Sequence, residues 1–209
     1  MELTLLKNQV AYFMRRLYER GLTTCLGGNI SLKVSGETIL ITPSGIDKGT
    51  ITGDQIGQIH PDGTNLTPKL KPSMETQMHL AVYTARPDVK AVIHAHPVTT
   101  STFAASNTQI NCRLLAESRL FLGEVRTAPY ACMGTSKLAE SVVHGLATGA
   151  NAVLMANHGA LTVGDSLLQA YDRMEVLESA AKITLMTRLL GNPQELNEHQ
   201  LTEIDCLFS

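Results

Sequence analysis

Two histidines separated by a single residue stand out in the segment "VIHAHP", which spans residues 92–97. His94 and His96 follow an apolar run that favours a strand, and side chains at positions i and i+2 of a strand point to the same face. Two imidazoles held in this way suit zinc or a similar divalent ion, and ligand sites commonly lie at strand ends in α/β sheets. The spacing also fits two partly exposed histidines without a metal, so the pair alone leaves both interpretations open.

A third histidine, His158, follows a second apolar run, "AVLMA" at 152–156. Gly159 comes next and permits a sharp change of chain direction. A third imidazole at the end of a neighbouring strand would complete the three-ligand set of a catalytic zinc site, with one position left for substrate. The alternative is an ordinary histidine in a turn after a strand. The other histidines lack such settings and are interpreted as structural or surface residues: His60, His79, His144 and His199.

Glu75 lies in the first turn of a helix that the pattern predicts to begin near Ser73. A carboxylate there is favoured by the helix dipole alone, which gives Glu75 a purely structural interpretation. Its functional interpretation is a fourth metal ligand that also leaves the metal and shuttles a proton.

Three short segments combine turn residues with hydrogen-bond donors: "GGN" at 27–29, "TPSG" at 42–45 and "KPS" at 71–73. Such segments offer backbone N–H groups, hydroxyls and a helix N-terminus to a phosphate group. Each one alone is equally compatible with a plain turn, and no GxxxxGK[ST] phosphate loop is present.

Composition narrows the class of protein. The chain has 209 residues, 44% of them hydrophobic and 17% charged, and a formal net charge of −2, which argues against nucleic acid or anionic membranes as partners. No window approaches the roughly 18 apolar residues of a membrane helix, and the N-terminus does not resemble a signal peptide. The four cysteines are scattered and form no CxxC pair, which predicts free thiols. We therefore expect one cytoplasmic domain over residues 1–209.

Hydrophobic periodicity gives the expected elements. We predict helices at 3–20, 73–85, 98–105 and 136–149, a long helix from a Ser166 capping box to Leu190, and a short one within 194–207; strands are predicted at 29–34, 38–43, within 55–66, at 89–96, 151–159 and 159–164. Residues 110–130 show no clear period. Because several strands are joined by hairpin-length loops, we predict a mixed, largely antiparallel α/β sheet with helices on both faces.

Six motifs occur in a telling order: "GGNIS" (27–31), "ITPSG" (41–45), "KPSMETQMH" (71–79), "HAHP" (94–97), "PYACMGT" (129–135) and "NHGALTVG" (157–164). On these motifs the chain resembles the class II aldolase/adducin family, which includes sugar-phosphate aldolases and epimerases. The resemblance implies a nine-stranded mixed sheet in a three-layer arrangement and a C4 homotetramer with active sites at subunit interfaces.

The resemblance also implies roles for residues. Zinc, or another divalent ion such as Mn²⁺ or Co²⁺, would be held by His94, His96 and His158, with Glu75 as ligand and acid/base. The implied phosphate-binding positions are Gly28, Asn29, Ser44, Gly45 and Ser73. The implied reaction is the reversible cleavage of a ketose 1-phosphate into dihydroxyacetone phosphate and an aldehyde. The metal stabilises the enediolate as a Lewis acid without a lysine Schiff base, and Glu75 exchanges the proton on the enediolate carbon.

Some residues separate the members of the family. Glu75 favours the aldolases, because the related ribulose-phosphate epimerases carry Asp at the matching position. Met74 replaces the second serine of the usual "PSSE", which removes one phosphate hydroxyl. No tyrosine occurs in 110–125 and the last one is Tyr171, so the tyrosine proton donors of fuculose-type aldolases have no match; Glu117 is a possible substitute.

The substrate therefore remains open between L-fuculose 1-phosphate, a 5-deoxypentulose 1-phosphate and 5-methylthioribulose 1-phosphate. Other possibilities within the fold are an epimerase, a dehydratase or a sugar-acid decarboxylase. A zinc hydrolase is disfavoured, because Val98 interrupts an HxHxD pattern and the chain is short for a TIM barrel. An adducin-like scaffold without activity would be expected to lack the three histidines.

Overall fold

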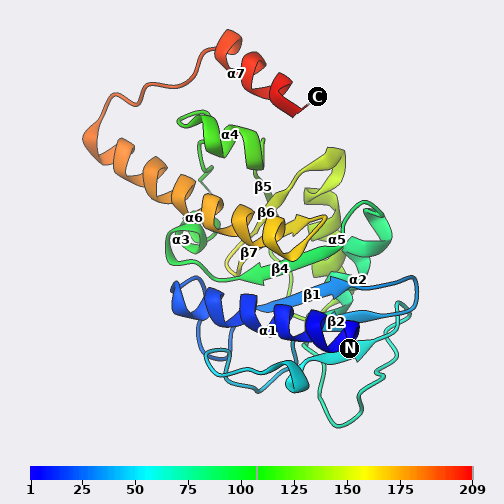
Figure 1. The fold of residues 1–209 in the computed structure, drawn as a ribbon. Coiled ribbons are helices and arrows are strands. Elements are labelled where there is room, and N and C mark those ends of the chain that lie inside the picture. The colour runs from blue at the N-terminus through cyan, green and yellow to red at the C-terminus, as the bar shows by residue number, and fades with distance from the viewer. Residues whose placement is uncertain (107, 209) are drawn as a thin grey trace.

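The computed structural model describes residues 1–106 and 108–208 and contains a seven-stranded sheet (Figure 1). Its strands are β1 (Asn29–Lys33), β2 (Ile39–Ile41), β3 (Gly57–Ile59), β4 (Ala91–Ala95), β5 (Arg126–Ala128), β6 (Ala152–Met155) and β7 (Gly159–Gly164). They lie in the order β3-β2-β1-β4-β7-β6-β5. Every neighbouring pair is antiparallel except β5 and β6, which are parallel. The prediction of a mixed, largely antiparallel sheet is confirmed.

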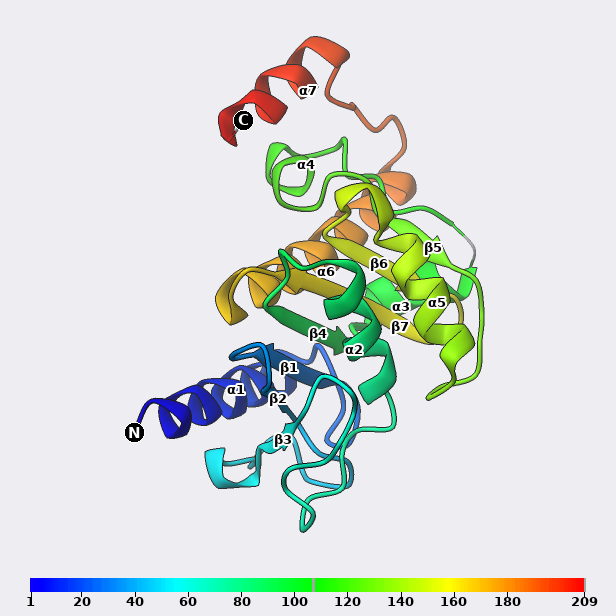
Figure 2. The same ribbon diagram turned by 90° about the vertical axis from the view of Figure 1, so that its right-hand side faces the viewer.

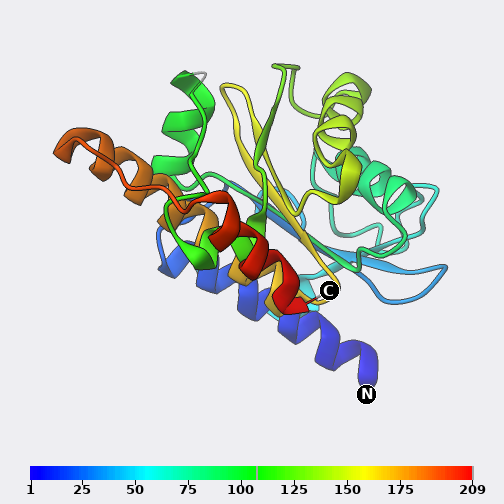
Figure 3. The same cartoon turned by 90° about the horizontal axis from the view of Figure 1, so that it is seen from above.

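Helices cover both faces of this sheet. They are α1 (Glu2–Glu19), α2 (Thr76–Ala85), α3 (Val98–Ser106), α4 (Ala116–Leu122), α5 (Ser136–Gly145), α6 (Leu167–Leu190) and α7 (Glu198–Asp205), with short 3₁₀ turns at Gly53–Gln55, Ala147–Gly149 and Cys206–Phe208. Figures 2 and 3 show α1, α3 and α6 on one face and α2 and α5 on the other. The three-layer arrangement follows, with one apolar core on each side of the sheet. No helix in the described ranges is both long and apolar enough to cross a membrane.

Strand β4 shows how the sheet separates its two cores. Ala91, Ile93 and Ala95 belong to the core beneath α1 and α6, whereas Val92 belongs to the core beneath α2 and α5. Successive side chains of a strand alternate between faces, so His94 shares the face of Val92. His94 is therefore directed toward the side of the sheet that carries α2.

The nine strands implied by the family resemblance are not found, since the described residues form seven. The strand expected within 55–66 is reduced to β3, and beyond it only a single bridge joins Ile59 to Asn65. Another single bridge joins Pro43 to Pro72, and proline has no N–H with which to extend a ladder. Helix α2 begins at Thr76 instead of Ser73, and residues 110–130 contain α4 and β5, which their weak periodicity did not reveal.

The long helix α6 begins and ends where the sequence predicts. The Ser166 side chain accepts a hydrogen bond from the Gln169 amide, as an N-cap residue does. The capping box is incomplete, because the Gln169 side chain accepts from the backbone of Asp165 instead of that of Ser166. Gly191, with φ of 75°, ends the helix after Leu190.

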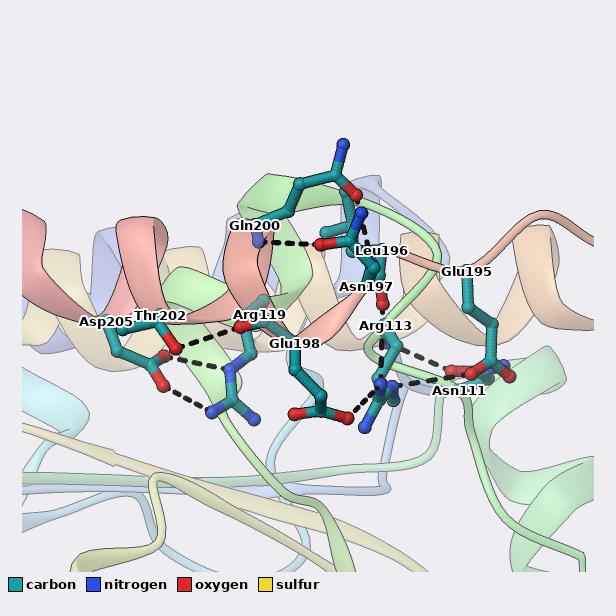
Figure 4. Close-up of polar contacts among 10 residues, drawn as sticks. All are labelled: Asn111, Arg113, Arg119, Glu195, Leu196, Asn197, Glu198, Gln200, Thr202 and Asp205. Atoms are coloured by element: carbon teal, nitrogen blue, oxygen red, sulfur yellow. Dashed lines mark hydrogen bonds and ion pairs between the residues drawn. The ribbon is translucent and has the colours of Figure 1, made fainter.

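The C-terminal segment turns back and is tied to the segment around α4 by ion pairs (Figure 4). Arg113 contacts Glu198 at 2.7 Å and Glu195 at 3.3 Å, and Arg119 Nε donates to Asp205 at 2.8 Å. Most of these side chains are exposed, and exposed pairs contribute only about 0–1 kcal/mol each. The contacts therefore fix the direction of α7 more than they stabilise the fold.

One buried carboxylate links α6 to the segment that follows the histidine pair. Glu178, which is 5% exposed, accepts hydrogen bonds from the backbone amides of Thr99 and Thr100 at 3.1 and 2.8 Å and from the Thr100 hydroxyl at 2.9 Å. These amides belong to the first turn of α3, whose orphan N–H groups need acceptors. Glu178 thereby holds the chain just after His96 and Pro97.

Glu178→Ala is expected to lower the free energy of unfolding by about 1–3 kcal/mol, because two amides near the buried end of α3 lose their charged acceptor. Urea denaturation at one fixed protein concentration measures this. Glu175→Ala is the matched control on the same helix: its side chain is 28% exposed and pairs with Arg20 at 3.0 Å. A control loss below about 1 kcal/mol is expected, and equal losses for the two variants would contradict the assigned role.

Candidate metal centre and active site

Three strands bring the candidate residues to one end of the sheet. Asn29 in β1 pairs with His94 in β4, and His94 pairs with Leu161 in β7. Because β1 and β7 are both antiparallel to β4, the start of β1, the end of β4 and the start of β7 meet there. His158 lies in the turn between β6 and β7, immediately before β7. It is therefore in a β-hairpin turn and not at the end of a predicted strand 151–159.

The three imidazole rings form one cluster. The ring centroid of His94 lies 4.6 Å from that of His96 and 4.8 Å from that of His158, and the centroids of His96 and His158 are 5.5 Å apart. One nitrogen from each ring can be chosen so that all three lie within 4.8 Å of one another. His94 is fully buried, while His96 and His158 are partly buried and face the cavity described below.

Two glycines make room for this cluster. A Cβ at Gly159 would lie 2.6 Å from both the Ala95 carbonyl oxygen and Cδ2 of His96. A Cβ at Gly28, where φ is +67°, would lie 2.8 Å from the His94 carbonyl oxygen. Any larger residue would clash with backbone at these positions, so the close approach of the strands requires glycine.

Glu75, at the N-cap position of α2, faces the cluster. Its Oε2 lies 3.0 Å from Nε2 of His94, and its Oε1 lies 3.2 Å from Nε2 of His158. The Asn29 amide donates to Oε2 at 2.9 Å. All four groups are largely removed from solvent, with Glu75 itself only 6% exposed.

The hydrogen bonds around His94 define its tautomer. Nδ1 of His94 lies 2.9 Å from the Ala160 carbonyl oxygen, which only accepts, so Nδ1 carries the proton. In the neutral ring Nε2 then presents a lone pair to the Glu75 carboxylate. This is the arrangement in which a histidine ligates a metal through one nitrogen while a carbonyl orients the other.

The donor set fits a divalent cation. Glu75 Oε1, His94 Nε2 and both ring nitrogens of His158 have no hydrogen-bond partner although they are buried. Lone pairs that face one another at about 3 Å in a dry site repel unless a proton or a cation lies between them. Three imidazole nitrogens with a carboxylate match the ligands that zinc prefers, so His94, His96 and His158 could hold such an ion, with Glu75 beside it.

The ionisation of the site follows from burial and mutual charge. Burial opposes the charge of Glu75, but the His94 ring, the Asn29 amide and His158 outweigh it and hold the pKa of this carboxyl below its usual range. Burial, reinforced by His94 and His158, lowers the pKa of His96 to about 3, and burial also lowers the pKa of His158. At neutral pH the cluster therefore combines the Glu75 carboxylate with neutral His96 and His158 rings, and metal binding requires this protonation state of them.

A cavity of about 240 Å³ opens beside this cluster. Its lining includes Glu75, His96 and His158 together with all five positions assigned to phosphate: Gly28, Asn29, Ser44, Gly45 and Ser73. The Asn29 side chain is already committed to Glu75, so it positions that carboxylate instead of offering its amide to a ligand. Ser44 donates to the Pro72 carbonyl oxygen at 3.1 Å, which joins two of the predicted turn segments.

Other lining residues were not singled out from the sequence. Lys48 lines the same cavity and is buried, and Leu26 and Met133 form part of its wall together with Met74. A single lysine in a loop carries no pattern that would have identified it. Glu117, in contrast, is exposed on α4 and is absent from this lining, so its role as proton donor stays a prediction. Larger hollows of about 470 and 540 Å³ lie near α4 and contain none of the three clustered histidines.

Comparison with known proteins agrees with this geometry. The model of the class II aldolase and adducin N-terminal domain family matches residues 8–185, which is most of the chain. The chain therefore belongs to this family.

Individual relatives carry different activities. The chain is 34% identical to an L-fuculose phosphate aldolase of Methanocaldococcus jannaschii over 88% of this chain and 98% of that one. It is 31% identical to a 5-deoxy-D-ribulose 1-phosphate aldolase of Bacillus thuringiensis serovar kurstaki, covering 97% and 94%. It is also 34% identical to a 3-oxo-tetronate 4-phosphate decarboxylase of Haemophilus influenzae, covering 81% of each. A solved L-fuculose 1-phosphate aldolase superposes with a TM-score of 0.86 at 32% identity, covering 95% of this chain and 93% of that one.

Purified protein prepared without chelator is expected to contain about one divalent ion per chain, because the buried acceptors need a cation. His94→Ala should lower this content several-fold, since it removes the most buried imidazole of the cluster. Elemental analysis by mass spectrometry measures both. His144→Ala, on the exposed side of α5, is the control and should retain the metal. Wild-type protein with far less than one ion per chain, or an unchanged content in His94→Ala, would contradict the assignment.

Proposed function

We propose that this protein is a metal-dependent class II aldolase that cleaves a ketose 1-phosphate reversibly into dihydroxyacetone phosphate and an aldehyde. The observation that carries the proposal is the single cavity that joins Glu75 and the histidine cluster to the Ser44 and Ser73 turns. The relatives named as aldolases of fuculose phosphate and deoxyribulose phosphate support the same reaction class. We further propose that residues 1–209 act as one cytoplasmic domain.

The metal proposed for His94, His96 and His158 is zinc, with Mn²⁺ or Co²⁺ as alternatives. When bound, a divalent ion supplies Lewis-acid stabilisation of the negative charge that develops on the carbonyl oxygen as the C3–C4 bond breaks. The chain orients this donor set through the His94–Ala160 hydrogen bond and keeps it dry by burial.

Glu75 is proposed as the acid/base. As the C3–C4 bond breaks, the C4 hydroxyl gives up its proton and C4 becomes the aldehyde, while the bonding electron pair passes to the enediolate. C3 must then receive a proton to give dihydroxyacetone phosphate. The Glu75 carboxylate lies next to the cluster and is oriented by the Asn29 amide at 2.9 Å. A positioned carboxylate of this kind can take up a proton and return it to carbon.

The phosphate end of the substrate is assigned to the turns that line the same cavity. The backbone at Gly28 and Gly45 has positive φ, at +67° and +73°, and the Ser44 and Ser73 hydroxyls stand beside it. Turns of this type present N–H groups to an anion. L-fuculose 1-phosphate and a 5-deoxypentulose 1-phosphate are the leading substrates, and 5-methylthioribulose 1-phosphate is an alternative.

A second candidate reaction is decarboxylation of a sugar-acid phosphate. It is favoured by the 34% identity to the Haemophilus influenzae decarboxylase. Both reactions break a carbon–carbon bond next to a carbonyl and leave an enediolate, so the same Lewis acid would serve both. An L-ribulose-5-phosphate 4-epimerase-like activity and an adducin-like scaffold without activity remain weaker alternatives.

We also propose a C4 homotetramer in which active sites lie at subunit interfaces. Apolar side chains at the cavity support this: Leu26, Met74 and Met133 are 63%, 65% and 56% exposed. Exposed apolar groups that cluster at a site are typical of surfaces that another chain covers.

Incubation of the metal-loaded enzyme with a panel of ketose 1-phosphates should release dihydroxyacetone phosphate from at least one of them, measured by a coupled reductase assay. The panel includes 3-oxo-tetronate 4-phosphate with detection of carbon dioxide. Carbon dioxide and dihydroxyacetone phosphate released together from 3-oxo-tetronate 4-phosphate, with no cleavage of any ketose 1-phosphate, would establish the decarboxylase instead. No product from any substrate would exclude both reactions.

Glu75→Gln is the matched variant for this assay, because it keeps the shape of the side chain but cannot take up a proton. We expect turnover to fall by about 10²–10⁴-fold. Exchange of a carbon-bound hydrogen of dihydroxyacetone phosphate with D₂O, followed by NMR, should fall in parallel. Glu140→Gln, exposed on α5, is the control. Unchanged hydrogen exchange in Glu75→Gln would remove Glu75 from the role of acid/base.

Light scattering during size-exclusion chromatography should give four times the mass of one chain if the tetramer forms. The apolar rim of the cavity would then be covered by a neighbouring subunit, so Met133→Asp is expected to shift the mass toward smaller species. Leu189→Asp, at the exposed end of α6, is the matched apolar-to-charged control and should keep the wild-type mass. A wild-type monomer with full aldolase activity would refute the interfacial active site.

A further inference from the structure

Lys48 is an unusual residue for a loop between β2 and the first 3₁₀ turn, because it is only 2% exposed. Lysine is almost never buried to this degree without a charged partner. Burying an ammonium group without a partner for its charge is costly, so the groups around Lys48 indicate what it binds.

The described residues supply only part of what this ammonium can bind. Nζ of Lys48 donates to the Pro43 carbonyl oxygen at 2.7 Å, but an ammonium has three donors. The neighbouring carboxylate of Asp47 is engaged elsewhere, with the Gly49 amide at 2.9 Å and the Thr50 hydroxyl at 3.3 Å. Among residues 1–106 and 108–208, no ion pair within 4.0 Å includes Lys48.

The position of Lys48 in the cavity indicates what the remaining donors of its ammonium group bind. Its side chain lines the cavity that also contains Ser44, Gly45 and Ser73, and no arginine or second lysine lines that cavity in the described chain. The backbone amide of Lys48 donates to the Cys25 carbonyl oxygen at 2.8 Å, which ties this loop to the segment leading into Gly28. The phosphate-binding turns are thus assembled around one buried cation.

We propose that Lys48 binds the phosphate group of the substrate and supplies the positive charge that the neutral turns lack. This inference rests on the proposed function only in that the ligand is a phosphate ester. Charge-assisted hydrogen bonds are the strong ones, and a phosphate dianion offers acceptors for the remaining ammonium donors. Burial lowers the pKa of Lys48 to about 8, so the group is still mainly protonated at neutral pH. The consequence is selectivity for phosphorylated over unphosphorylated ketoses.

Two substitutions separate the charge from the structural contact. Lys48→Gln keeps an N–H donor for the Pro43 carbonyl oxygen but has no charge, and Lys48→Met removes both. Titration calorimetry on metal-loaded protein measures the dissociation constants of dihydroxyacetone phosphate and inorganic phosphate. Both variants should bind these ligands about 10- to 100-fold more weakly. Lys69→Gln, exposed in a neighbouring loop, should bind them like wild type.

Unphosphorylated dihydroxyacetone distinguishes the two possible roles of Lys48. Its KM as the donor that adds to the aldehyde in the condensation direction should stay within about twofold of wild type in both variants. Metal content and melting temperature should be retained in Lys48→Gln. Equal losses for dihydroxyacetone and its phosphate, or full phosphate binding by Lys48→Gln, would overturn the proposal. Phosphate binding that depends on Lys48 in a protein without aldolase turnover would refute the proposed function but uphold this inference.

Discussion

The contact between the Glu75 carboxylate and the facing nitrogens of His94 and His158 is the constraint on which the site depends. Because Nδ1 of His94 is committed to the Ala160 carbonyl oxygen, its Nε2 confronts the carboxylate as a second acceptor at 3.0 Å. Such a pair is unfavourable in a buried site unless a proton or a cation lies between its members. The fold therefore holds the Glu75 carboxylate and these nitrogens in positions that favour the binding of a positive charge between them.

A directional chain of hydrogen bonds supports that contact from behind. The Glu75 carboxylate only accepts, so the Asn29 amide nitrogen must face it and the Asn29 oxygen must face His79. Nε2 of His79 then carries the proton, and its Nδ1 accepts from the Ser31 hydroxyl at 2.6 Å. Burial lowers the pKa of His79 to about 3, which keeps the ring neutral. The hydrogen bonds of the chain can then run in only one direction from donor to acceptor. Strand β1 and helix α2 are thereby locked together at the point where Glu75 projects.

The sequence predicts this end of the sheet better than the edges because its signals are periodic. The alternation of side-chain direction along "AVIHA" places His94 on the same face as Val92, and an apolar run predicts the strand before His158. The turn that carries His158 and the reduction of 55–66 to three residues depend on which strands find partners, which local sequence does not encode. Helix α4 is short and held by Arg113 and Arg119 contacts to the C-terminal segment, so no local period marks it.

The charges of the cavity have a consequence for substrate orientation. On the proposed function, a divalent ion at the histidines attracts the carbonyl end and Lys48 attracts the phosphate, so a ketose phosphate is held at two points. The turns at Gly28 and Gly45 line the same cavity as Lys48 and Glu75. The remaining end of the sugar must then extend toward Leu26, Met74 and Met133, where the wall is apolar and exposed. Aldolase and decarboxylase relatives can therefore share the residues that contact the carbon–carbon bond to be broken. Discrimination between an aldehyde and carbon dioxide as leaving group is assigned to the groups that cover the apolar wall.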